Sequence, residues 1–145
     1  MYGRISNNYN RVAVETADQK TLILICYDEA LRSLRKGKEF YLTKKFEEKG
    51  RQFNRAQNFI SELASSLNLE AGGEIANYLN NIYQFVGREI LQADLTGDMT
   101  RIDKLTAMLS ELRSAWAEID TRPSAGVMPS QSYGQVALAA RGFAV

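Results

Sequence analysis

An all-α fold, an antiparallel up-down four-helix bundle, is predicted by three features of the sequence. The prolines are Pro123 and Pro129, so residues 16–120 contain none. Apolar side chains recur at helical spacing in four segments of about 20 residues, and no segment alternates as a strand would. Short connections join these segments, which makes consecutive helices antiparallel neighbours. We expect residues 16–120 to form the bundle, residues 1–15 to pack on it, and residues 121–145 to form a flexible tail.

The first predicted helix begins after Thr16 and ends between Lys36 and Tyr41. Thr16 and Gln19 have capping-box spacing, in which each side chain bonds a backbone amide near the helix start. The apolar side chains cover an arc of about 200°, so this helix should be buried on more than one side. They are Leu22, Ile23, Leu24, Cys26, Tyr27, Ala30, Leu31 and Leu34, with Ile25 outside the arc.

The second predicted helix spans about residues 44–67 and has a narrower apolar face. Its heptad seam consists of Phe46, Phe53, Ala56, Ile60, Leu63 and Leu67. A narrow stripe of this kind is typical of a helix at the periphery of a bundle. Phe59 is expected to lie off the seam.

The third predicted helix spans about residues 71–93, and Gly72-Gly73 should let the chain turn tightly into it. Its core stripe is Ile75, Leu79, Ile82, Val86, Ile90 and Ala93. Tyr83 extends the stripe on one side, while Tyr78 and Phe85 lie together on the other. Two interpretations stay open for Tyr78 and Phe85: they pack against a neighbouring helix or flank, or they line a groove for another chain.

The fourth predicted helix starts at Thr100, which we expect to be the N-cap, with Asp103 in the first turn. Gly97, in the preceding turn, should adopt a left-handed backbone conformation. The core seam of this helix is Ile102, Leu105, Leu109, Leu112, Trp116 and Ile119.

The composition argues against several classes of function. A net charge of +1 predicts neither a nucleic-acid surface nor an anionic membrane as partner. No run of about 18 apolar residues occurs, so we do not expect an integral membrane protein. Cys26 is the single cysteine and cannot form an internal disulfide, which suits the cytoplasm. Histidine is absent, which removes its acid–base chemistry and most catalytic zinc sites; we expect no enzyme, no metal and no cofactor.

Several motifs, in a fixed order along the chain, resemble the flagellar export chaperone family FliS. The stretch YNRVAVETADQKTLILICYDEALRSL carries a tyrosine, a valine and a Thr-Ala cap before a leucine-rich helix. LNLEAGGEIA, IYQF, REILQA and LRSAW follow, so the resemblance covers about residues 9–119. Asp18 stands where the family usually has proline, Glu29 where it usually has glycine, and the tail after Pro123 is longer and more apolar than the family's.

The resemblance implies a cytoplasmic, non-enzymatic chaperone that binds the disordered C-terminal segment of flagellin in a hydrophobic groove. Binding would prevent premature polymerisation and keep flagellin competent for flagellar type III export. The residues that we assign to the groove are Tyr27, Tyr78, Ile82, Tyr83 and Phe85. The alternative is a general helical adaptor that binds another flagellar export or regulatory protein, such as the export gate or an anti-sigma factor.

The resemblance also implies that the N-terminal segment covers part of the hydrophobic surface when no client is bound. We assign Ile5, Tyr9 and Val12 to this displaceable lid; the alternative makes them a permanent part of the core. The tail is either disordered or docked. In the docked alternative, QVALAARGFAV at residues 135–145 forms a short amphipathic helix in the client groove.

Overall fold

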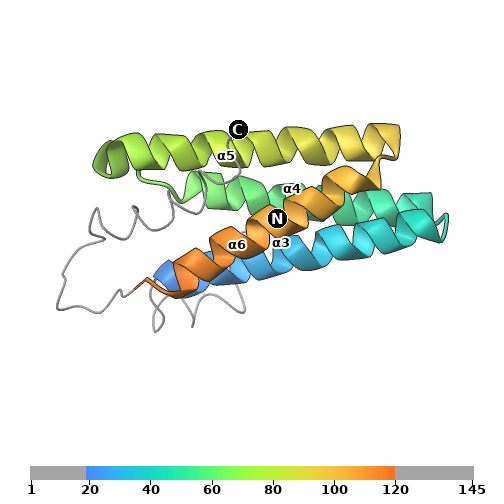
Figure 1. Cartoon of the computed structure of the whole chain (residues 1–145), viewed down its shortest axis with the longest axis horizontal. Coiled ribbons are helices and arrows are strands. Elements are labelled where there is room, and N and C mark those ends of the chain that lie inside the picture. Colours follow the sequence, from blue (N-terminus) through green and yellow to red (C-terminus); the bar gives the residue numbers. More distant parts are fainter. Residues whose placement is uncertain (1–18, 120–145) are drawn as a thin grey trace.

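The computed structural model describes residues 19–119, and these residues form four helices without any strand (Figure 1). The helices are α3 (Gln19–Leu42), α4 (Phe46–Ser65), α5 (Leu69–Thr96) and α6 (Met99–Ala117). Each helix packs on its neighbours in sequence, and α6 closes the ring by packing on α3. The predicted all-α, antiparallel four-helix bundle is confirmed. The flanks, with Ile5, Tyr9, Val12 and Thr16, lie outside the described residues.

The connection from α4 to α5 contains a glycine that the backbone requires. The Asn68 side chain caps α5 by accepting a hydrogen bond from the Ala71 amide at 3.0 Å. Gly73 then has φ of 56° and ψ of −131°, which breaks the helix before it resumes. A side chain would be strained at this φ, so Gly73 sets the direction in which the rest of α5 runs. The helix therefore starts two residues before the predicted position, with a kink.

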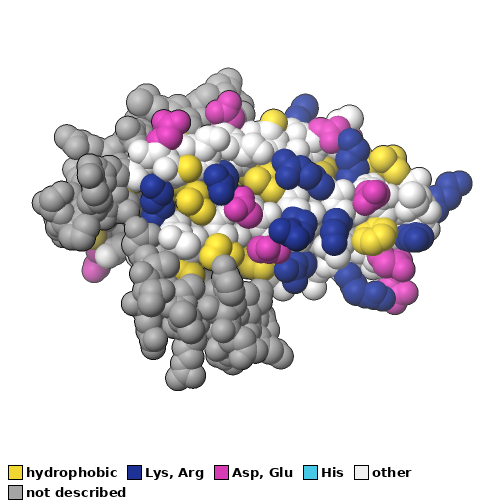
Figure 2. All heavy atoms as spheres, turned by 90° about the horizontal axis from the view of Figure 1, so that it is seen from below, with side chains coloured by type: hydrophobic (Ala, Val, Ile, Leu, Met, Phe, Trp, Pro, Cys, Tyr) yellow, Lys and Arg dark blue, Asp and Glu magenta, His cyan; other side chains and the backbone are white. Residues whose placement is uncertain are grey.

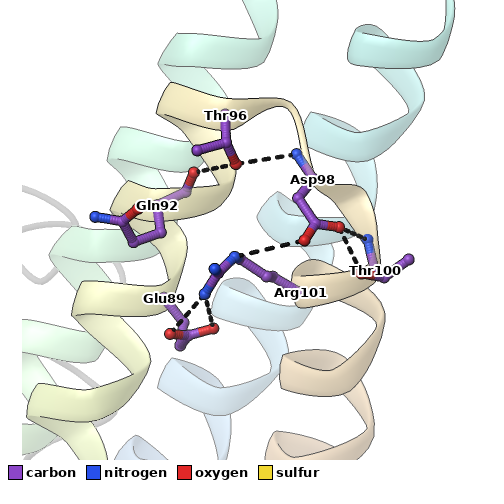
Figure 3. Close-up of polar contacts among 6 residues, drawn as sticks. All are labelled: Glu89, Gln92, Thr96, Asp98, Thr100 and Arg101. Atoms are coloured by element: carbon purple, nitrogen blue, oxygen red, sulfur yellow. Dashed lines mark hydrogen bonds and ion pairs between the residues drawn. The ribbon is translucent and has the colours of Figure 1, made fainter.

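The corner between α5 and α6 is fixed by a polar network (Figure 3). Gly97 ends α5 with the expected left-handed conformation, at φ of 75°. The prediction that Thr100 caps α6 is wrong, because Asp98 is the N-cap and its carboxylate accepts hydrogen bonds from the Thr100 amide and hydroxyl. The Thr100 bonds are the main reason why the pKa of Asp98 lies below its ordinary value. Asp98 thus begins α6 directly after the turn.

The core runs along the interior of all four helices. Its largest fully buried side chains are Trp116, Tyr27, Tyr83, Phe53 and Phe59. The predicted seam of α6 is confirmed, since all six of its members are buried. For α4 the seam is partly wrong: Phe59 is 2% exposed and Phe46 is 54% exposed. Since α4 packs on both α3 and α5, its apolar face is wider than a heptad seam and is shifted toward Phe59.

Ion pairs and hydrogen bonds join the outer edges of neighbouring helices. Arg113 of α6 donates two hydrogen bonds to the carboxylate of Asp28 in α3, at 2.8 and 3.1 Å. Between α4 and α5, Gln57 donates to the Gly87 carbonyl at 2.7 Å, and the Lys49 ammonium lies 2.6 Å from a carboxylate oxygen of Asp94. Across residues 19–119, no helix is long and apolar enough to cross a membrane.

Candidate functional site

The five residues predicted to line a client groove fall into two groups. Tyr27, Ile82 and Tyr83 are buried, with exposed fractions of 0, 6 and 2%. Tyr78 is half-buried against the core, and Phe85 is 37% exposed. Two members of the set are therefore accessible on the surface, and three lie beneath it in the interior.

The buried tyrosines contact one another, although their helices, α3 and α5, lie diagonally opposite in the bundle. The phenolic oxygens of Tyr27 in α3 and Tyr83 in α5 are 2.7 Å apart, and the rings meet edge to face with centroids 6.4 Å apart. Burial raises the pKa of the Tyr27 hydroxyl well above its ordinary value, and Tyr83 raises it further. The Tyr27 phenol therefore stays neutral at ordinary pH, and the pair links α3 and α5 through the middle of the bundle.

Tyr78 and Phe85 occupy the edge of α5 that faces α6. They are seven residues apart, so they lie two turns from each other on one side of the helix. Glu89 follows Phe85 by one turn, and its two carboxylate oxygens accept hydrogen bonds from Arg101 of α6 at 2.8 and 2.9 Å (Figure 3). Because residues one turn apart share a helix face, Phe85 is directed toward α6, as Glu89 is. We call Tyr78, Ile82 and Phe85 the α5 edge.

The α5 edge lies where the bundle is least tightly closed. Among the four pairs of ring neighbours, α5 and α6 have the least extensive contact, while α3 and α4 have the most extensive. The two helices meet at the Gly97 corner and then diverge, so the N-terminal half of α5 is far from the C-terminal half of α6 (Figure 1). The Glu89–Arg101 pair lies near the corner, and the Tyr78 end of the edge lies toward the divergent part.

Other apolar side chains are exposed away from the α5 edge. Besides Phe85, the large exposed hydrophobic residues of the described range are Leu42, Phe46, Leu69, Leu91 and Leu95. A pocket of about 400 Å³ opens between α4 and α5 beside Leu91. Sequence reasoning missed this area because it assigned Phe46 to the core. The position of Leu91, outside the core stripe of α5, was the available signal.

The chemistry available at these surfaces is that of apolar and ionic binding. Residues 19–119 contain no group of three or more acidic or cysteine side chains that could hold a metal ion. Seen from the underside of Figure 1, charged side chains of both signs cover much of the bundle, with hydrophobic patches between them (Figure 2). An α5 edge of partly exposed aromatic rings beside a closed core can contact an apolar strip of another chain.

Comparison with known proteins gives a consistent result. A family model described as flagellar protein FliS matches residues 1–123. The flagellar secretion chaperone FliS of Salmonella typhimurium is 33% identical over 113 residues, which cover 77% of this chain and 84% of the relative. The FliS chaperone of Vibrio cholerae is 29% identical over 115 residues, covering 77% and 85%. That of Escherichia coli is 29% identical over 113 residues, covering 77% and 83%.

Proposed function

The chain belongs to the FliS family of flagellar proteins, and on this premise we propose that it is a secretion chaperone for flagellin. It binds the disordered C-terminal segment of flagellin in the cytoplasm and acts without enzymatic activity. The single observation that carries this proposal is the α5 edge, where two aromatic side chains remain accessible beside a bundle whose interior is already filled. That surface exceeds what α5 needs to hold the fold together.

The binding mode that fits this edge is a helix in a groove. An amphipathic client segment would lay its apolar side along Tyr78, Ile82 and Phe85, with α6 as the opposite wall. Tyr27 and Tyr83 lie below as the floor, where the hydrogen bond between their hydroxyls links α3 to α5. Aromatic rings suit such a wall because they bury a large area at low cost in side-chain entropy.

The proposed mode explains how a chaperone can both protect and release its client. While the apolar side of the flagellin segment is covered, it cannot pair with other flagellin subunits. The segment folds only on binding, and the entropy lost in ordering it lowers the net affinity. A complex of this kind is specific and still dissociates when the client is handed to the export machinery.

The test is calorimetry with a peptide from the flagellin C-terminus of the same organism. We expect binding to the full chain, and a loss of about tenfold or more in affinity for Tyr78→Ser combined with Phe85→Ser, as for truncated anchors at other interfaces. Leu69→Ser is the matched control: Leu69 is 46% exposed on the same helix but lies before the Gly73 kink. Unchanged affinity in the double variant, or an equal loss in the control, would contradict the proposal.

A further inference from the structure

The chain leaves α6 at the end of the bundle where α5 and α6 have diverged most (Figure 1). Ile119, at the end of the described range, is 1% exposed. Its amide donates to the Trp116 carbonyl at 3.2 Å, and its carbonyl accepts from the Lys20 ammonium at 2.6 Å. Because both backbone groups are bonded, the point from which residues 120–145 continue is fixed. That point lies at the same end of the bundle as the first turns of α5 (Figure 1).

Apolar side chains of both α5 and α6 remain half-buried at this end. The Glu89–Arg101 pair sets the antiparallel register of the two helices, in which Ile75 lies at the level of Ala115. Ile75, Ala115 and Tyr78 all pack against the core, yet each is only partly buried. We call these three residues the open end of the α5 edge. Since the two helices diverge here, the apolar surface of the α5 edge continues past Tyr78 without being closed by α6.

Residues 120–145 start beside this surface, whereas residues 1–18 do not. They follow α6, which is the helix that packs next to the α5 edge. Residues 1–18 precede α3, which packs on α4 and α6 and lies diagonally opposite α5. Of the two flanks, the one after α6 therefore has the shorter way to the open end of the α5 edge.

The sequence after α6 predicts that the chain reverses its direction. Pro123 lacks the backbone amide that a longer α6 would need. Gly126, Pro129 and Gly134 then favour turns. As a flexible chain, residues 120–134 would have an r.m.s. span of about 20 Å, so they can return to α5 without being fully extended.

The segment QVALAARGFAV at residues 135–145 has one small, apolar side when it is drawn as a helix. The members of that side recur at spacings of three and four residues. They are Val136, Ala139, Ala140 and Phe143, and Leu138 falls on the opposite side. The helix would be about 16 Å long, which matches the length of about 15 Å from Ile75 to Phe85. So short a helix is marginal in water, so we expect it to form only against a surface.

The charges at the open end of the α5 edge also fit this segment. Arg141 is the single charged residue of residues 123–145. Lys20 is a cation of this end, but exposed carboxylates outnumber it. They include Glu74 on α5 and Glu111 and Glu118 on α6, none of which is in an ion pair among residues 19–119. An apolar segment that carries one cation is therefore attracted to this end.

We propose that residues 135–145 of this chain dock as a short helix on the α5 edge, between α5 and α6. The apolar side with Phe143 would lie against Tyr78 and Phe85, and Arg141 would be directed toward Glu74. Because the segment is tethered, its effective concentration is on the order of millimolar, so a weak contact is enough to keep it in place. A ligand of higher affinity can still displace it.

The consequence for the client rests on the proposed function, which assigns the flagellin segment to the same surface. A client would bind only the fraction of molecules in which residues 135–145 are displaced, so its apparent affinity falls in proportion to that fraction. Between clients, the docked segment would cover the aromatic side chains of the α5 edge. The protein would thus carry its own competitor for the client surface.

Disulfide trapping in the full-length chain tests the contact without any client. Asn81→Cys places a thiol on an exposed position between the two aromatic residues of the α5 edge, and Ala139→Cys places one on the apolar side of the segment. The buried Cys26 is left unchanged. Mild oxidation should join the two new cysteines within one chain, as detected by mass spectrometry of peptides. Asn58→Cys/Ala139→Cys is the matched control, since Asn58 is exposed on α4, and it should form no such bond.

Competition is measured with the flagellin peptide and full-length variants. Phe143→Ser removes the largest side chain of the apolar side and should raise the affinity for the peptide about threefold or more. Leu138→Ser, on the opposite side of the same helix, should leave the affinity unchanged. Arg141→Glu should raise the affinity too, and the gain should be larger at low salt than at high salt.

Several results would overturn the docking of residues 135–145. One is the absence of an intrachain disulfide in Asn81→Cys/Ala139→Cys, or an equal yield in the Asn58→Cys control. A disulfide that forms only between two chains would assign the surface to a second copy. A disulfide in Asn81→Cys/Asn10→Cys, with none in Asn81→Cys/Ala139→Cys, would assign it to the N-terminal segment. Equal affinity of Phe143→Ser and the unaltered chain for the flagellin peptide would overturn the competition.

The two proposals for the α5 edge fail in different ways. If the disulfide forms but the flagellin peptide binds neither the unaltered chain nor Phe143→Ser, the docking stands and the proposed function is wrong. If the peptide binds both proteins equally and no disulfide forms, the docking is wrong and the proposed function stands.

Discussion

Tyr27 and Tyr83 place their hydroxyl oxygens 2.7 Å apart across the diagonal of the bundle, with both side chains almost completely buried. Each phenol supplies a polar partner for the other in the interior, so their contributions to stability should be coupled. We expect Tyr27→Phe and Tyr83→Phe each to lower the free energy of unfolding by about 1 kcal/mol, the usual net value of a buried hydrogen bond. The measurement is urea denaturation of both single variants and the double variant.

The coupling appears in the double-mutant cycle. The loss in Tyr27→Phe/Tyr83→Phe should be smaller than the sum of the two single losses, by about 0.5 to 1.5 kcal/mol. Strict additivity would show that the two hydroxyls stabilise the fold independently. In that case the short contact would not stabilise the link between α3 and α5.

The same pair predicts a loss of stability at high pH. Burial raises the pKa of Tyr27 well above 10.0 in the folded protein, whereas the unfolded chain titrates near that ordinary value. Below about pH 10 the Tyr27 phenol is neutral in both the folded and the unfolded state, so its ionisation does not lower the free energy of unfolding. Above about pH 10 the unfolded state ionises first, and the free energy of unfolding falls. Circular dichroism between about pH 8 and about pH 12 should show unfolding that is shifted to higher pH in Tyr27→Phe/Tyr83→Phe.

Lys44 predicts a variant that is more stable than the natural sequence. The turn after α3 has Lys44 at φ of 63°, with hydrogen bonds from Lys44 to the Tyr41 carbonyl and from Lys45 to the Phe40 carbonyl. This pattern is a Schellman motif, whose left-handed position favours glycine. Lys44→Gly should raise the free energy of unfolding by about 0.5 kcal/mol, because the relief of strain exceeds the added flexibility of the unfolded chain.

Lys44→Ala is the control for that prediction, since it removes the charge and keeps the Cβ atom. Its melting temperature should not rise. If alanine stabilised the protein as much as glycine, the gain would come from reduced repulsion among the cations of the stretch 32–55 and not from the backbone. Thermal unfolding of the three proteins at low and high salt distinguishes these causes.

The lid assignment of Ile5, Tyr9 and Val12 remains a prediction, and deletion of residues 1–14 tests it. A displaceable lid competes with the client, so its removal should increase both the affinity for the flagellin peptide and the fluorescence of a dye that binds apolar surfaces. Truncation after Ser124 is the parallel test for the tail: an unchanged dissociation constant would exclude competition by QVALAARGFAV. Weaker client binding in the 1–14 deletion, with no rise in dye fluorescence, would show that these residues belong to the core.

The features of the fold that were predicted from the sequence are those set by residues close together in the chain. The seam of α6 and the left-handed Gly97 depend on helical spacing and local backbone conformation, and both were predicted. Asp98 displaced Thr100 as the cap because each has a side chain suited to that position, and the choice depends on where the turn at Gly97 ends. Phe46 and Phe59 were misplaced because the width of a buried face depends on how many helices pack against it.

The candidate site was predictable only in part for a related reason. A helical wheel placed Tyr78 and Phe85 off the axis of the core, and both are partly accessible in the structure. It could not show that Tyr27 would meet Tyr83, because that contact joins residues 56 positions apart on helices that are not ring neighbours. The pocket beside Leu91 likewise requires two helices at a defined separation, which no single segment specifies.

The corner at Gly97 has a mechanical consequence. There Asp98 and the Glu89–Arg101 pair hold α5 and α6 together, while the rest of α5 back to Gly73 is a rigid rod of about 35 Å. A rotation of the rod by about 5° about the corner would move its far end by about 3 Å, roughly the width of a methyl group. Such a hinge motion could widen the space beside Tyr78 while the Asp98 cap of α6, which lies at the pivot, stays intact.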